Sequence, residues 1–164
     1  MAEGTPAFPP IWVGIVGSRE IGTVCNCPPE RKDQAHWEDC RLVTDWLHML
    51  RVIRQLSTNY NLAGIVSGGA AGADTLAENA ATMMEVPCKV FPVRSGPGTF
   101  ASRAFARNSL IVGMSSRLIA FFAPGLLSRG TVDTVKKAVT KGIPVHCLHE
   151  GHWYEGLPPV NSRP

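Results

Sequence analysis

The stretch that decides the fold is "IVSGGAAGADTLAENAA", residues 65–81, in which two β-branched residues run into glycine and alanine and then into helix-forming residues. A buried strand that passes through a glycine-rich turn into a helix is typical of phosphate sites, because the N–H groups at a helix N-terminus attract anions. The turn has no lysine, and it matches neither GxxxxGK[ST] nor GxGxxG. The sequence therefore predicts a phosphate site that is neither an ATP-binding P-loop nor an ordinary NAD site.

Outward from this turn, strand-like and helix-like segments alternate along the chain. Short apolar runs predict strands at 11–16, 62–67, 88–93, 117–123 and 144–149. Apolar residues spaced by three and four, or helix-forming composition, predict helices at 33–57, 73–85, 99–114 and 131–141. We expect an α/β fold: a single doubly wound, mainly parallel sheet of the modified Rossmann type, with helices on both faces.

The length of 164 residues, of which 45% are hydrophobic, is enough for one domain with a buried core. We expect a disordered N-terminal segment at 1–10, the domain at 11–150 and a loose C-terminal tail at 151–164. No apolar run approaches the roughly 20 residues that span a bilayer, so we expect a cytoplasmic protein without a membrane partner.

Basic residues dominate one half of a chain whose net charge is only +3. Between Val86 and Val132 there is no Asp or Glu, and this window contains Lys89, Arg94, Arg103, Arg107, Arg117 and Arg129. Arg19, Arg94 and Arg129 each follow a predicted strand, so we expect them at the edge where the carboxyl ends of the strands meet. Guanidinium groups bind phosphate or carboxylate with two parallel hydrogen bonds, which makes an anionic ligand the preferred interpretation.

Three turns combine glycine with small hydroxyl residues: "GSR" (17–19), "SGGAAGAD" (67–74) and "SRGTVD" (128–133). With "GIVGSR" (14–19), "ARNSLIVGMSSRLIAF" (106–121) and "SRGTVDTVKKA" (128–138), they give the chain a resemblance to the SLOG superfamily. This superfamily contains the modified Rossmann domains of DprA/Smf DNA-processing proteins and of LOG-type nucleotide enzymes. The resemblance covers about residues 11–149 and is closest to DprA-like stand-alone members.

The resemblance implies a ligand site. In DprA-like proteins the Gly-Ser-Arg turn and an Arg-Asn pair belong to a basic pocket for single-stranded DNA. Together with the other glycine turns and arginines, this predicts the phosphate-binding residues Gly17, Ser18, Arg19, Ser67, Gly68, Gly69, Gly72, Arg103, Arg107, Asn108, Arg129, Gly130 and Thr131.

Two functions follow from this site. The first is binding of single-stranded DNA without catalysis and without a cofactor. The alternative is a binder or hydrolase of a free nucleotide or nucleotide-derived signal, as in LOG-like proteins. Whether the chain forms a homodimer stays open.

Catalysis is not the preferred interpretation. LOG-type enzymes, which cleave a nucleotide N-glycosidic bond, carry PGGxGTxxE, and this chain has "APGLLSRGTVDT" with Leu126 at the second glycine and Thr134 at the glutamate. If the protein were such a hydrolase, Asp133 or Asp74 would be the candidate catalytic carboxylates. Both also fit a simpler role as first-turn charges that stabilise a helix.

The five cysteines do not predict a disulfide framework, because their number is odd and no secretory context accompanies them. Cys25, Cys27, His36 and Cys40 offer sulfur and nitrogen ligands for zinc, although their spacing is not a standard one. We therefore expect no metal site and keep zinc at these four residues as the alternative.

Overall fold

The computed structural model describes residues 8–27, 40–125 and 127–159. Its elements in chain order are β1 (Ile11–Gly17), α1 (Arg41–Asn59), β2 (Leu62–Ser67), α2 (Ala73–Met83), β3 (Cys88–Val90), α3 (Phe100–Met114), β4 (Arg117–Phe122), α4 (Arg129–Lys141), β5 (Val145–His149) and β6 (His152–Glu155).

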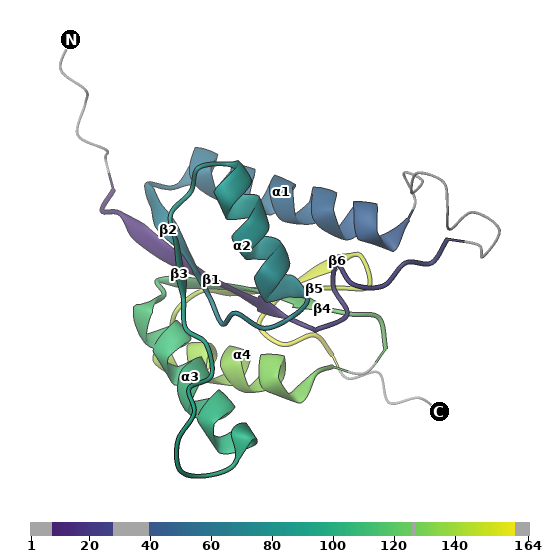
Figure 1. The fold of residues 1–164 in the computed structure, drawn as a ribbon. Coiled ribbons are helices and arrows are strands. Elements are labelled where there is room, and N and C mark those ends of the chain that lie inside the picture. The colour runs from purple at the N-terminus through teal and green to yellow at the C-terminus, as the bar shows by residue number, and fades with distance from the viewer. Residues whose placement is uncertain (1–7, 28–39, 126, 160–164) are drawn as a thin grey trace.

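The strands form one sheet in the order β3-β2-β1-β4-β5-β6. All neighbouring pairs are parallel except β5 and β6, which are antiparallel. Helices α1 and α2 cover one face of the sheet, and α3 and α4 cover the other (Figure 1). This confirms the predicted doubly wound α/β fold. The direction of winding reverses between β1 and β4, which is where open parallel sheets form a ligand crevice.

The central strand β1 shows why the sheet is apolar on both sides. Val13 and Ile15 belong to the core cluster that α1 and α2 complete, whereas Val16 belongs to the cluster on the α3 and α4 side. A strand buried on both faces has no polar alternation, so its sequence is a continuous apolar run.

Several predicted boundaries moved. Strand β3 ends at Val90 instead of residue 93, since Pro92 has no N–H to continue a ladder. Helix α4 begins two residues earlier than predicted, at Arg129. Helix α1 runs from Arg41 to Asn59, and residues 33–39 of the predicted helix lie outside the described residues.

Part of the segment expected to be a loose tail (151–164) forms a strand. His152–Glu155 form β6, which pairs with β5 through a two-residue turn at Glu150 (φ 49°) and Gly151 (φ 78°). Positive φ at both central residues is the geometry of a tight hairpin turn. The ring of Trp153 then packs edge-on against Phe121, with centroids 6.2 Å apart. Residues 1–7 and 160–164 lie outside the described residues.

None of the described helices is both long enough and apolar enough to span a bilayer.

Candidate phosphate-binding pocket

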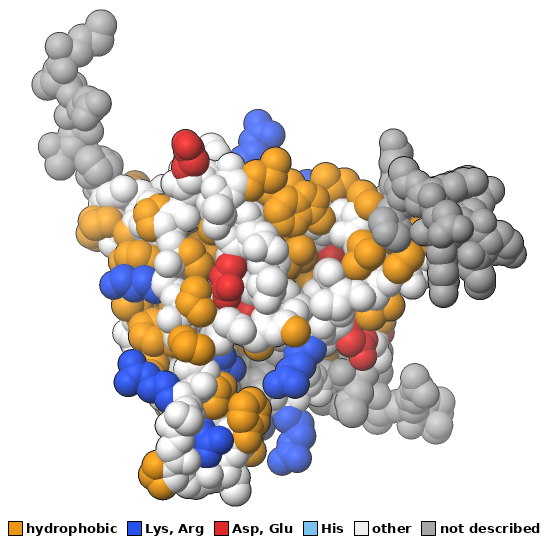
Figure 2. All heavy atoms as spheres, in the orientation of Figure 1, with side chains coloured by type: hydrophobic (Ala, Val, Ile, Leu, Met, Phe, Trp, Pro, Cys, Tyr) orange, Lys and Arg blue, Asp and Glu red, His pale blue; other side chains and the backbone are white. Residues whose placement is uncertain are grey.

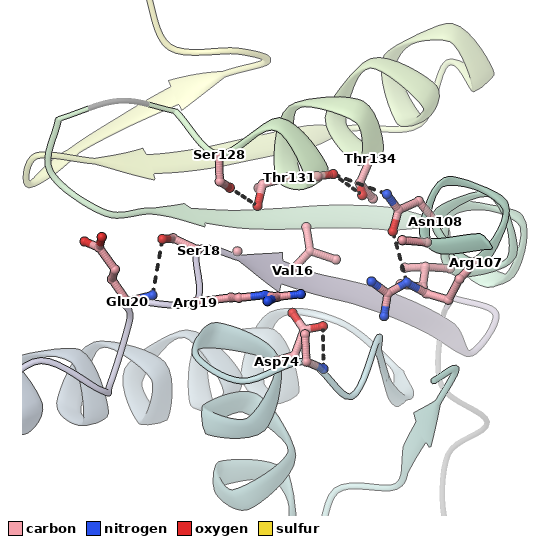
Figure 3. Close-up of a pocket in the computed structure, with 15 residues that line it drawn as sticks. Val16, Ser18, Arg19, Glu20, Asp74, Arg107, Asn108, Ser128, Thr131 and Thr134 are labelled. Carbon is pink, nitrogen blue, oxygen red and sulfur yellow. Dashed lines mark hydrogen bonds between the residues drawn. The ribbon is translucent and has the colours of Figure 1, made fainter. Parts of the chain in front are cut away.

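A pocket of about 390 Å³ opens beside the carboxyl end of β1, at the point where the strand order reverses (Figure 3). The turn after β1, the N-terminal ends of α2 and α4, and one face of α3 surround it. Its lining residues are Val16, Gly17, Ser18, Arg19, Glu20, Ala70, Asp74, Ala104, Arg107, Asn108, Ile111, Ser128, Gly130, Thr131 and Thr134.

Two guanidinium groups point toward one another in this pocket (Figure 3). Arg19 is exposed, and its side chain donates no hydrogen bond to any described residue. Arg107 is half-buried on α3: burial lowers the pKa of Arg107, the Asp74 carboxylate raises it, and the charge of Arg19 lowers it. Because the two cations repel each other, an anion between them would interact favourably with both.

Arg107 is held in place before any ligand arrives. Its Nη1 donates to the backbone oxygens of Gly68 and Phe91, and its Nε donates to Oδ1 of Asn108 at 3.0 Å. The amide Nδ2 of buried Asn108 donates to Oδ2 of Asp133, also at 3.0 Å. Asn108 therefore links α3 to α4 and acts as a positioning residue for Arg107.

The N-terminus of α4 supplies backbone donors to the same pocket. The N–H of Val132 donates to the Ser128 oxygen at 3.0 Å, so the N–H groups of residues 129–131 precede the first intrahelical bond. The Ser128 hydroxyl donates to Oγ1 of Thr131 at 2.6 Å, and both side chains face the pocket. With the positive end of the helix dipole, this is the arrangement that binds a phosphate.

In the "SGGAAGAD" turn, three N–H groups form hydrogen bonds within the turn itself. Oδ2 of Asp74 accepts hydrogen bonds from the N–H groups of Gly68 (3.1 Å) and Ala70 (3.3 Å). The N–H of Gly69 donates to Oγ of Ser67 at 3.2 Å. The anion next to these N–H groups is thus the carboxylate of Asp74, and the phosphate contact expected at Gly68 and Gly69 would have to compete with bonds inside the turn.

The carboxyl group of Asp74 is buried and its pKa is raised. Burial raises the pKa of Asp74, hydrogen bonds from the Ala70 and Gly68 N–H groups and the charge of Arg107 lower it, and the charge of Glu78 raises it, for a result of about 6. A carboxyl group with a raised pKa in a cleft is a feature of functional sites.

The glycine turns at 17–19 and 67–74 are in direct contact. Gly72 has φ 93°, a backbone conformation that glycine adopts readily and other residues rarely do. A Cβ at this position would also collide with the backbone of Ser18 and Arg19. The first and second glycine turns therefore form one wall of the pocket, and Arg19 leaves that wall toward Arg107.

The sequence-predicted residues divide into two groups. Those that line the pocket are Gly17, Ser18, Arg19, Arg107, Asn108, Gly130 and Thr131. Those that do not are Ser67, Gly68, Gly69, Gly72, Arg103 and Arg129. Ser67 donates instead to Glu78, and Arg103 donates to the backbone oxygens of Gly96 (2.9 Å) and Gly98 (2.6 Å), which braces the loop before α3.

Sequence reasoning missed several lining residues. The polar ones are Glu20, Ser128 and Thr134, and the apolar ones are Val16, Ala70, Ala104 and Ile111. A signal existed for Glu20 and Ser128, which adjoin the predicted turn residues Arg19 and Arg129. Nothing in the sequence indicates that Ala104 and Ile111 line the pocket; they do so because of how α3 packs.

The two candidate catalytic carboxylates are not equivalent. Asp74 lines the pocket, whereas Asp133 does not and is paired with Lys137 at 2.6 Å as well as with Asn108. Asp133 thus serves the connection between α3 and α4.

Away from the pocket, Cys25, Cys27 and Cys40 converge, with their sulfur atoms all within 4.8 Å of one another. Burial raises the pKa of Cys40, but hydrogen bonds from Cys27, Cys25 and the N–H groups of Leu42 and Val43 lower it to about 7. His36, the fourth predicted ligand, lies outside the described residues.

Comparison with known proteins bears on the fold. No protein-family profile matches the chain, and no curated protein matches it. Among solved structures the chain is similar to DNA processing protein A (DprA) from Streptococcus pneumoniae, with 19% identity and a TM-score of 0.57. The match covers 93% of this chain and 52% of that one, so the chain spans about half the length of DprA. The expected DprA-like fold is confirmed, while membership of the wider SLOG superfamily stays a prediction.

Proposed function

We propose that the pocket binds the phosphate group of a free nucleotide or nucleotide-derived ligand, and that the protein is a binder. The observation that carries this proposal is the pair of facing guanidinium groups, Arg19 and Arg107, in a pocket that the N-terminus of α4 also lines. A phosphate between them would receive charge from both arginines and hydrogen bonds from the N–H groups of Gly130 and Thr131.

The size and lining of the pocket favour a compact ligand. A volume of about 390 Å³ lies within the range of about 300–1,000 Å³ that is usual for small-molecule sites. The carboxylates of Glu20 and Asp74 suit a ligand that brings hydroxyl donors next to its phosphate, as a ribose does. The apolar side chains of Val16, Ala104 and Ile111 suit the remaining, less polar part.

Single-stranded DNA is the second candidate, favoured by the charge distribution and by the similarity to the DprA fold. In Figure 2 most Lys and Arg side chains of the visible face gather over α3, the loop that precedes it and α4. Two observations place it second: the pocket lining contains no aromatic side chain on which a base could stack, and Arg103 is bonded to loop carbonyls.

The test compares two arginine variants of equal charge. Arg19→Ala removes a pocket guanidinium that no described residue uses, and Arg54→Ala removes an exposed one on α1, across the sheet from α4. Calorimetric titration with nucleoside mono- and diphosphates should show about a 10- to 100-fold loss of affinity in Arg19→Ala, since a charge-assisted hydrogen bond contributes about 1.5–3 kcal/mol. Arg54→Ala should bind as the wild type does.

An oligothymidine titration separates the two candidates. A strand that engages several phosphates loses affinity steeply with salt, by about 0.7 in log–log slope for each phosphate, whereas a mononucleotide gives a shallow dependence. Steep oligothymidine binding without mononucleotide binding would favour DNA. Equal nucleotide affinity in Arg19→Ala and wild type would refute the proposed site.

A further inference from the structure

The sulfur atoms of Cys25, Cys27 and Cys40 come together from two separate segments of the chain. Cys25 and Cys27 lie in the segment that follows β1, and Cys40 directly precedes α1. All three sulfur atoms lie within 4.8 Å of one another, and Sγ of Cys25 is 3.6 Å from Sγ of Cys40. A zinc ion bound by thiolates at about 2.3 Å in a tetrahedron holds its sulfur ligands about 3.8 Å apart, so the observed spacing is close to that of a metal site.

The backbone around the cluster is arranged as it is around metal-bound thiolates. The N–H of Cys27 donates to Sγ of Cys25 at 3.4 Å, and such N–H to sulfur contacts stabilise a negatively charged sulfur ligand. Cys40 occupies the N-cap position of α1, so its sulfur lies at the positive end of a 19-residue helix.

Other hydrogen bonds fix the same two segments to each other. The N–H of Gly22 donates to Oδ2 of Asp45 at 2.7 Å, and the N–H of Arg41 donates to Oδ1 of Asn26 at 2.9 Å. The three cysteines are therefore held on a braced framework, which reduces the conformational entropy lost on binding a metal.

We propose that Cys25, Cys27 and Cys40 form a structural zinc site that clips the segment after β1 to the start of α1. Three thiolates select a soft or borderline ion, and among the common divalent cations zinc suits a sulfur-rich tetrahedral site without redox chemistry. The described residues supply three ligands, and the fourth position takes water or a further donor. Since Arg19 and Glu20 belong to the same segment, the zinc site also steadies one side of the phosphate pocket.

The experiment uses the full chain without a histidine tag, purified under reducing conditions. Metal analysis should find one zinc per chain in the wild type and none in the Cys25→Ser and Cys27→Ser variants, both of which change cysteines that are not fully buried. Cys88→Ser, which changes a half-buried cysteine on β3, is the matched control and should retain zinc. A chelator should lower the melting temperature of the wild type and of Cys88→Ser by several degrees, because a bound metal stabilises the folded state by mass action.

Cobalt substitution provides a readout that does not depend on folding stability. Co²⁺ bound to thiolates gives an intense sulfur-to-metal charge-transfer band, and its visible spectrum distinguishes four-coordinate from six-coordinate geometry. We expect the band in the wild type and in Cys88→Ser, and its loss in Cys25→Ser. The proposal is overturned if reduced, zinc-supplemented protein holds no metal, if Cys25→Ser and Cys27→Ser bind zinc as the wild type does, or if mass analysis finds a Cys25–Cys40 disulfide in metal-free native protein.

Discussion

Asp74→Asn removes a buried charge from the glycine turn, and its consequence depends on pH in a calculable way. The asparagine side-chain oxygen can still accept from the N–H groups of Gly68 and Ala70, so the turn keeps its hydrogen bonds. The pKa of Asp74 is raised from 3.8 to about 6, chiefly by burial. A shift of about 2 units corresponds to about 3 kcal/mol between the protonated and ionised forms.

The sign follows from linkage. The folded state binds the Asp74 proton more tightly than the unfolded state does, so the stability from this group is fully present below about pH 4. It is lost as pH rises through about 6. The stability of wild type relative to Asp74→Asn should therefore fall by about 2–3 kcal/mol between pH 4 and pH 7.

Denaturant unfolding at a series of pH values measures this difference. Glu20→Gln, which removes an exposed carboxylate of the same pocket, is the matched control, and the pH dependence that belongs to Asp74 is the difference between the two variants. A wild-type to Asp74→Asn difference that is constant, or that grows with pH, would refute the reasoning.

Protonation of Asp74 should also change the affinity of the pocket for anions. Inorganic sulfate, whose charge is constant between pH 5 and 8, avoids the titration of phosphate itself. Two like unit charges about 8 Å apart repel each other by about 2 kcal/mol at an effective dielectric constant of about 20. Asp74 lines the same pocket as the bound anion, so its charge opposes binding. Sulfate affinity should rise at least about tenfold as pH falls through 6 in the wild type and stay level in Asp74→Asn.

Two glycine substitutions separate binding from folding. A Cβ at Gly130 meets nothing within 4 Å, so Gly130→Ala should stabilise the fold by about 0.5–1 kcal/mol in thermal unfolding. Because Gly130 lines the pocket and alanine keeps the backbone N–H, calorimetry should show weaker nucleotide binding through the added methyl group, and unchanged affinity would mean that the ligand does not approach this Cα. A Cβ at Gly17 would lie 2.6 Å from that of Ala73 and collide with the Phe121 oxygen, so Gly17→Ala should cost about 3 kcal/mol or more and lower the melting temperature by about 6 °C or more. The control is Gly113→Ala, whose Cβ meets nothing within 4 Å, and a Gly17→Ala protein as stable as this control would contradict the expected clash.

The fold was predictable because its determinants are local. The buried strands β1, β2 and β4 are mostly continuous apolar runs, and a helix follows each of them in the chain, so order and period suffice. The sequence does not predict the hairpin at Glu150 and Gly151, since a glutamate at positive φ is uncommon and the strand after it has only four residues.

The candidate site was predictable only in part. Residues at the ends of β1 and at the start of α4 meet at the switch point because topology requires it, and Arg19 and Thr131 were found for that reason. The roles of the arginines on α3 were not, because helical spacing puts Arg103 and Arg107 on one face without saying what each touches. Arg103 is bonded to the preceding loop and Arg107 to the glycine turn.

The glycine turn without a lysine has a physical explanation in these contacts. In a P-loop, the turn's N–H groups are open to a phosphate and the lysine brings the charge. Here the Asp74 carboxylate accepts hydrogen bonds from two of those N–H groups, and the Gly68 backbone oxygen accepts a hydrogen bond from the Arg107 guanidinium. The turn thus acts as a rigid support that aims a guanidinium into the pocket, so the cation comes from α3 and the backbone donors from α4. A ligand should consequently sense this turn through Arg107 and through the charge on Asp74, which is why the pH dependence of Asp74→Asn tests the site more directly than a change in the glycines themselves.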